Sequence, residues 1–234
     1  MPLIKYLANL GYGSRRDVTA LIAAQRVCRS DGTVLCDDDP FTHAELRIDG
    51  APADPAPGAI LLLNKPIGYV CSTRDVPPLV YALLPRRFLK RRPVMATVGR
   101  LDRDTSGLLL LTDDGTLNHR LTAPRSTLVK TYRATLAHDI SSDVVERFAS
   151  GTLLLDGERT PLLPATATVL DQRVIELTIT EGRYHQVRRM LAATGNHVVT
   201  LQRVAIGRLP LGEMAEGTWR ELGADERLRL TSPR

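Results

Sequence analysis

Apolar residues recur three and four positions apart over residues 3–10, and this spacing predicts a short amphipathic helix that ends at Gly11. Ser14 is of a residue type that caps helices well, so a second helix is expected from there to about Gln25. Short apolar pieces separated by Asp-Gly turns follow it. Residues 1–50 are therefore expected to form a small unit of two helices and short strands.

The stretch at 51–58 reads Ala-Pro-Ala-Asp-Pro-Ala-Pro-Gly and cannot continue a helix, because its prolines lack a backbone N–H and favour extended conformations. We predict a linker and a domain boundary here. A chain of 234 residues suits one small and one large domain. The expected organisation is a small domain at 1–50, a linker at 51–58 and a larger domain at 59–234.

Beyond the linker, apolar runs typical of strands alternate with segments of helical periodicity. No dinucleotide-binding fingerprint, glycine-rich phosphate loop or internal repeat interrupts this pattern. The strand spacing favours an α+β fold on a mainly antiparallel, mixed sheet over a doubly wound parallel one. Strands are expected at 59–64, 107–112, 128–136, 166–170, 173–180 and 198–204, and helices at about 115–123, which ends before Pro124, 140–150 and 184–194.

The composition narrows the class of protein. With 43% hydrophobic residues the chain can bury a sizeable core, and it offers neither an apolar run long enough for a membrane span nor a secretory signal. The three cysteines, Cys28, Cys36 and Cys71, are scattered and odd in number, which fits free thiols better than a disulfide framework or a metal knuckle. A reducing cytoplasm is the expected compartment.

The formal net charge of +5 fits a polyanionic partner such as nucleic acid. Residues 1–50 carry six basic and seven acidic side chains, so the excess of positive charge lies in the larger domain. The run at 86–92, Arg-Arg-Phe-Leu-Lys-Arg-Arg, is either a solvated face or a clamp for RNA phosphates. Arg15 and Arg16 gain little from the first turn of a helix unless they meet a phosphate.

The most distinctive polar segment is Gly-Arg-Leu-Asp-Arg-Asp-Thr-Ser-Gly at 99–107, which opens directly into four leucines. A polar loop at the end of a buried strand holds its side chains on a rigid element, which suits chemistry. Spacing alone cannot choose between Asp102 and Asp104, and aspartates in turns often bond only nearby backbone amides.

This segment, with four others in the same order at 64–73, 130–132, 181–190 and 195–199, resembles the motifs of RNA pseudouridine synthases of the small-subunit ribosomal RNA (RsuA) type. Residues 1–50 resemble the alpha-L RNA-binding module of the ribosomal protein S-four kind. The resemblance implies an isomerase that acts without a cofactor or metal on 16S ribosomal RNA, whose target in this family is uridine 516. It also implies a cytoplasmic monomer.

In this family the aspartate after leucine is catalytic, which points to Asp102 and leaves Asp104 a role in the loop. The resemblance also implies that Tyr132 lies beside the uracil, with a role in removing the C5 proton, and that Arg188 pairs with Asp102. Helical geometry from Tyr184 onward agrees, since Arg188 borders the apolar face and can reach inward to a carboxylate. His185 is expected to be structural.

Contacts to RNA are assigned to seven basic residues, of which Arg189 is expected to face solvent or phosphate. Two alternatives stay open: the same chemistry on large-subunit ribosomal RNA or tRNA, and a ribosome-assembly factor that binds RNA without catalysis. The latter is disfavoured because Asp102, Tyr132 and Arg188 are all present. The seven predicted RNA-binding residues are Arg15, Arg16, Lys65, Arg100, Lys130, Arg183 and Arg189.

Overall fold

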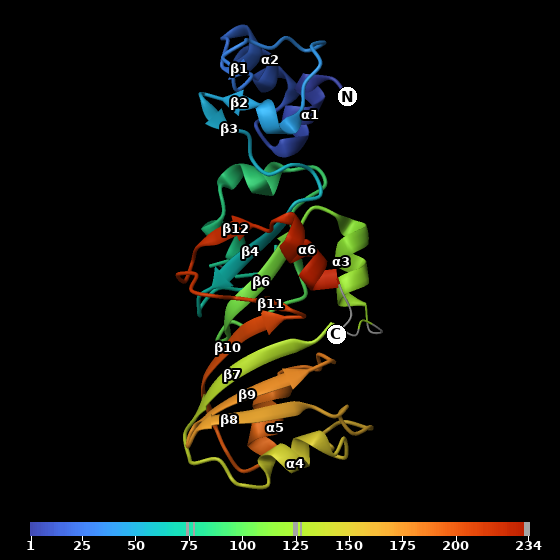
Figure 1. The fold of residues 1–234 in the computed structure, drawn as a ribbon, viewed down its shortest axis with the longest axis vertical. Coiled ribbons are helices and arrows are strands. Elements are labelled where there is room, and N and C mark those ends of the chain that lie inside the picture. Colours follow the sequence, from blue (N-terminus) through green and yellow to red (C-terminus); the bar gives the residue numbers. More distant parts are fainter. Residues whose placement is uncertain (74, 77, 124–125, 127, 232–234) are drawn as a thin grey trace.

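The computed structural model describes residues 1–73, 75–76, 78–123, 126 and 128–231, so the predicted stop at Pro124 lies outside the described residues. Figure 1 shows an elongated molecule with the N-terminal unit at one end and α4 and α5 at the other. None of the helices in the described part of the chain is long and apolar enough to cross a membrane.

The N-terminal unit begins with the two predicted helices, α1 (Leu3–Leu10) and α2 (Arg15–Ala23). Gly11 ends α1 in a left-handed conformation, and Ser14 caps α2 through a reciprocal capping box with Asp17. The one-turn helix η1 (His43–Glu45) and a small antiparallel sheet of β1 (Val27–Cys28), β2 (Arg47–Ile48) and β3 (Ala51–Pro52) complete the unit.

The predicted linker begins later than expected, because Ala51 and Pro52 pair with β2. Pro52 is tolerated there because β3 is an edge strand, where a missing N–H costs no ladder bond.

The larger domain is built on a nine-stranded sheet with the order β12-β4-β6-β10-β7-β9-β8, to which β5 and β11 are attached. Among the described strands, β6 and β10 pair in parallel and the other neighbours pair antiparallel, which confirms the predicted α+β class. The strands are β4 (Ile60–Lys65), β5 (Ala96–Val98), β6 (Ser106–Thr112), β7 (Lys130–Leu136), β8 (Thr166–Asp171), β9 (Val174–Ile179), β10 (Val198–Ile206), β11 (Leu209–Pro210) and β12 (Trp219–Glu221).

Helices pack on this sheet near the predicted positions but are shorter, and the two short helices η2 and η3 and the last helix were not anticipated. In Figure 1, α3 and α6 lie beside the half of the sheet near the N-terminal unit. The helices are η2 (Val80–Leu83), η3 (Arg86–Lys90), α3 (Gly115–Thr122), α4 (Val144–Ala149), α5 (Gln186–Ala193) and α6 (Ala224–Thr231).

The core explains why β4 and β6 are apolar at consecutive positions rather than at alternate ones. Leu61, Leu63, Leu109 and Leu111 join one buried cluster, while the intervening residues of both strands join a second cluster on the opposite face. A sheet covered on both faces needs apolar side chains at every position. Both strands, including β6 that follows the polar loop at 99–105, are therefore buried along their whole length.

Candidate active site

Asp102 lies in the loop that enters β6, beside the middle of the sheet. Gly107 in β6 has a φ of +102°, and a Cβ at this position would lie 2.4 Å from the backbone oxygen of Arg203 in β10. Only glycine allows the two strands to approach this closely. The parallel pairing of β6 with β10 thus fixes the base of the loop against the central strand.

Lys65, at the end of β4, fixes the backbone of the loop at 100–105. Its side chain is fully buried, and Nζ donates to the backbone oxygens of Asp102 at 3.0 Å and Thr105 at 2.8 Å. Burial lowers the pKa of this ammonium. Lys65 was predicted to bind RNA; in the structure, carbonyl groups of the protein surround its ammonium.

A cavity of about 310 Å³ opens beside Asp102. It joins segments that are far apart in the sequence: the loop at 100–105, one residue each from β7, β9 and β10, and the segment at 182–188. The structure therefore brings Asp102, Tyr132 and Arg188 to one cavity, together with the predicted RNA contacts Arg100 and Arg183.

Arg188 forms its ion pair with Asp104 rather than with Asp102. Its Nη2 lies 2.9 Å from the Asp104 carboxylate and donates to the Asp104 carbonyl at 3.0 Å. The Nε of Arg188 is buried and bonds to none of the described residues. The predicted pairing is corrected in this structure: Arg188 ties Asp104 to α5, and no arginine of the described residues forms an ion pair with the Asp102 carboxylate.

The carboxylate of Asp102 lies beside His185, with 3.4 Å between Oδ1 and Nε2 of the imidazole. Sequence reasoning placed His185 away from the site because it extended the helix from Tyr184. The helix instead begins at Gln186, and His185 adopts a left-handed conformation with φ 47°. Its ring stacks on Tyr184 with 4.0 Å between centroids. Because the helix starts two residues later than predicted, the imidazole of His185 points to Asp102 instead of away from it.

Tyr132 lines the cavity from β7 with Arg203 of β10 behind it. The guanidinium carbon of Arg203 lies 6.0 Å from the centre of the ring, and Nη1 is 3.5 Å from the hydroxyl oxygen. Arg203 is buried and donates through Nε to the Leu108 carbonyl at 2.7 Å, so it links β10, β6 and Tyr132. Sequence reasoning missed it; the only signal was a lone arginine inside an otherwise uncharged strand.

A family model for RNA pseudouridylate synthases matches residues 59–193, which include every segment that lines the cavity except β10. The chain belongs to this family. It is 40% identical, over all of its length and 99% of the other chain, to ribosomal small subunit pseudouridine synthase A of Yersinia pestis. It is 47% identical to the protein of that name from Pasteurella multocida over 72% of each chain. A crystal structure of a pseudouridylate synthase, 36% identical, superimposes with a TM-score of 0.70 over 99% of this chain and all of the other.

This pseudouridine synthase is therefore an isomerase that acts on uridine in RNA. Such an enzyme must break the bond from uracil N1 to the ribose, turn the base and form a bond from C5, which calls for a carboxylate near the sugar. Asp102, with 40% of its side chain exposed, is accessible from the cavity. Among the described residues, no three His, Cys, Asp or Glu side chains lie close enough together to hold a metal ion.

The remaining predicted RNA contacts of the synthase fall into two sets. Arg183 and Arg189 both bind Glu158, at 3.2 and 2.8 Å, and also donate to backbone carbonyls of residues 156–161. These bonds brace the 156–161 loop against α5, so most of their donors are used within the protein, contrary to the prediction that Arg189 faces solvent. Arg15, Arg16 and Arg100 are exposed, and Lys130 is partly buried, which lowers its pKa.

Proposed function

We propose that this chain isomerises one uridine of small-subunit (16S) ribosomal RNA, with uridine 516 as the expected target and Asp102 as the catalytic group. The observation that carries the proposal is the cavity that joins Asp102 to Tyr132 and Arg188 from three separate motifs. The target is supported by full-length similarity to a relative named for the ribosomal small subunit.

In this proposal the target nucleotide turns out of its helix into the cavity, and the uracil lies against the ring of Tyr132. Asp102 attacks the anomeric carbon, or stabilises the positive charge there, while the N1–C1′ bond breaks. The base then turns, C5 bonds to C1′, and the C5 hydrogen leaves as a proton while N1 gains one. Tyr132 is the group proposed to relay the C5 proton, with its hydroxyl oriented by Arg203.

Two basic side chains hold the loop at 100–105 in place during this chemistry. Lys65 fixes the carbonyl of Asp102, and Arg188 fixes Asp104. The imidazole of His185 lies 3.4 Å from the carboxylate proposed to react. This division gives Asp104 a structural role and leaves Asp102 available to the ribose.

The test uses 16S ribosomal RNA and small-subunit particles labelled with tritium at C5, because the isotope is released when C5 bonds to the sugar. We expect release with the natural chain and a loss of about 10³-fold or more with Asp102→Asn. Asp104→Asn is the matched control and should lose no more than about tenfold, since its ion pair is exposed.

The product is then mapped along the RNA to find the modified position. Release that persists in Asp102→Asn would remove this residue from the chemistry. Release only from large-subunit RNA or tRNA would correct the target, and no release from any of these RNAs would favour an assembly factor.

A further inference from the structure

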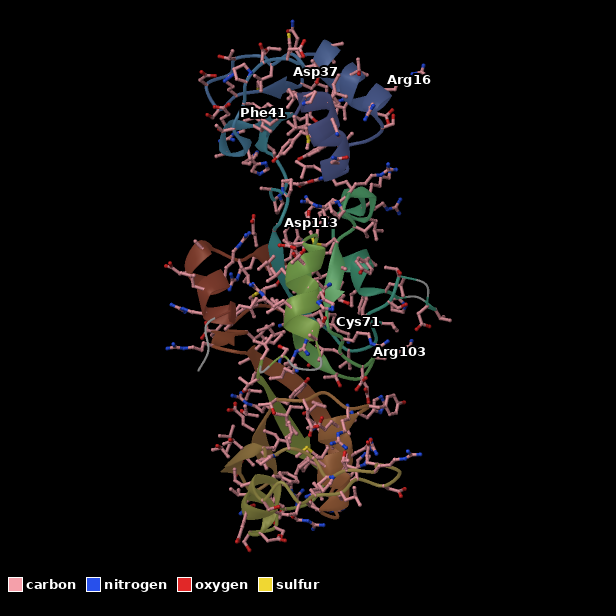
Figure 2. The ribbon with its side chains drawn as sticks, turned by 90° about the vertical axis from the view of Figure 1, so that its right-hand side faces the viewer. Arg16, Asp37, Phe41, Cys71, Arg103 and Asp113 are labelled. Carbon is pink, nitrogen blue, oxygen red and sulfur yellow. The ribbon has the colours of Figure 1, made fainter. Side chains whose placement is uncertain are left out.

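The basic run at 86–92 separates into side chains that face the protein and side chains that face solvent. Arg91 is 1% exposed, and its Nη2 lies 2.6 Å from the carboxylate of Asp113. Arg91 also donates to the carbonyls of Pro55 and Ala56 in the linker, at 2.9 and 3.2 Å. Figure 2 shows Asp113 at the junction between the two domains. Arg91 therefore fastens the linker to the larger domain.

Arg87 makes the corresponding contact with the N-terminal unit. It forms a bidentate pair with Asp54, and its guanidinium lies 5.6 Å from the ring centre of Tyr12. The hydroxyl of Tyr12 in turn accepts from the backbone N–H of Asp54 at 2.8 Å. Arg91 is therefore neither part of a solvated face nor a phosphate clamp, whereas Arg87 pairs with Asp54 while 46% of its side chain stays exposed.

The end of α1 is seated directly on η3 by backbone contacts. The N–H of Arg92 donates to the carbonyl of Asn9 at 2.8 Å. Gly11 packs so closely that a Cβ there would lie 2.1 Å from the carbonyl oxygen of Arg87. A contact this tight holds the N-terminal unit in one position against the larger domain.

The docking leaves a groove of about 740 Å³ between the two domains. Lys5 and Arg15 line it from the N-terminal unit, and Lys90 and Arg92 line it from the basic run. All four side chains are exposed, and no acidic residue is among the described residues that line the groove. The nearby carboxylate of Asp17 accepts from the backbone N–H and the hydroxyl of Ser14, within the cap of α2.

Four cations from two domains around one groove repel one another unless an anion lies between them. In Figure 2, Arg16 of α2 and Arg103 of the loop at 99–105 project to the same edge of the molecule, so each domain presents a basic side chain there.

We propose that this groove binds the sugar–phosphate backbone of RNA that flanks the target uridine, so that both domains grip the RNA as one rigid surface. The choice of RNA as the polyanion rests on the proposed function. The partner is recognised by its phosphates, and sequence is not read here.

The test replaces the four cations at once, in Lys5→Gln/Arg15→Gln/Lys90→Gln/Arg92→Gln, and measures binding of a labelled RNA hairpin over a range of salt concentrations. Each phosphate contact contributes about 0.9 to the slope of log affinity against log salt, so the slope should fall by about 3 to 4. Between 50 and 200 mM salt the advantage of the natural chain should shrink by about 100-fold. The matched control removes four exposed arginines outside the groove, Arg120→Gln/Arg147→Gln/Arg173→Gln/Arg208→Gln, and should keep the natural slope.

A slope that is unchanged in the groove variant, or that falls equally in the control, would overturn the proposal. With 16S ribosomal RNA as substrate, we expect KM to rise in the groove variant while kcat is unchanged, since none of the four residues lines the cavity. Hairpin binding requires no catalysis. If the natural chain fails to modify 16S RNA but the slopes still differ, the proposed target fails and the groove stands.

Discussion

Two fully buried cations hold two loops of this molecule in different ways. Lys65 lies under the catalytic loop and Arg91 under the linker, and both donate to backbone carbonyls. Arg91 also faces the buried carboxylate of Asp113, whereas no carboxylate of the described residues lies within ion-pair distance of Lys65. Burial lowers the pKa of Lys65 accordingly.

The difference follows from what each loop has to do. At the linker, the guanidinium of Arg91 is neutralised by Asp113, and this contact only has to hold the linker in place. At the catalytic loop, an ammonium satisfied by carbonyls fixes the backbone of Asp102 and leaves the carboxylate itself free of an ion pair with Lys65. A carboxylate in a buried pair with a cation would be a poorer nucleophile. The comparison predicts that Arg91 matters chiefly for stability and Lys65 chiefly for turnover.

The largest effect on stability is expected from Arg91→Met, which leaves the carboxylate of Asp113 buried and unpaired. Removing one member of a buried ion pair costs about 3–5 kcal/mol. Urea denaturation should show this loss, and Arg91→Met/Asp113→Leu should recover part of it because the orphaned charge is gone. The kcat of the folded molecule should be unchanged, since Arg91 does not line the cavity. Equal stabilities of the single and double variants would mean that the pair does not act as a buried pair.

Lys65→Met should show the opposite balance. The variant leaves carbonyls without a donor but buries no orphaned charge, so the free energy of unfolding should fall by about 1–3 kcal/mol. Turnover should fall about 100-fold, because a shift of about 1 Å in a reacting group costs that much. Tritium release under saturating RNA measures it. A variant that is as unstable as Arg91→Met yet turns over normally would reverse the comparison.

The two sites also differ in how far the sequence predicted them. The sequence correctly predicted that the polar run at 99–107 opens into a buried strand, because this is a local pattern. The partners of its side chains were not predicted. Arg188 was assigned to Asp102 and Lys65 to phosphates, since helix faces and strand ends do not show which carbonyl or carboxylate lies across the fold.

The basic run was harder to interpret, because Arg91 is buried while the other cations of the run are exposed. Nothing in the run itself separates Arg91 from Arg92; the separation depends on Asp113 and the linker carbonyls, which are distant in sequence. Arg203 was missed for the same reason. Long-range partners decide whether a cation is structural, and a single sequence does not reveal them.

A third cation, Arg188, lies between the two cases, since it pairs with a carboxylate of the catalytic loop itself. Arg188→Lys keeps the charge but cannot bond the carboxylate and the carbonyl of Asp104 through one planar group, while also reaching the Val198 carbonyl. We expect about a tenfold loss of kcat, smaller than in Lys65→Met because Asp104 is exposed. RNA binding should be unchanged. Turnover equal to that of the natural chain would show that Asp104 does not need the planar guanidinium of Arg188.

The smallest effect is the dependence of stability on pH that Lys65 should add. Because its pKa is lowered in the folded state, the unfolded chain binds more protons between that pKa and the ordinary value of 10.5. The cost of burying the charge is fully present at neutral pH and is relieved as pH rises through this window. The stability of the natural chain relative to Lys65→Met should therefore rise by about 1.4 kcal/mol per unit of pKa shift. Denaturation of both chains from neutral pH upward measures the difference, and a relative stability that falls with pH would show that Lys65 gains its proton on folding.

Turnover of the natural chain should decline over the same pH window, because a neutral amine has one N–H fewer for the carbonyls that hold Asp102.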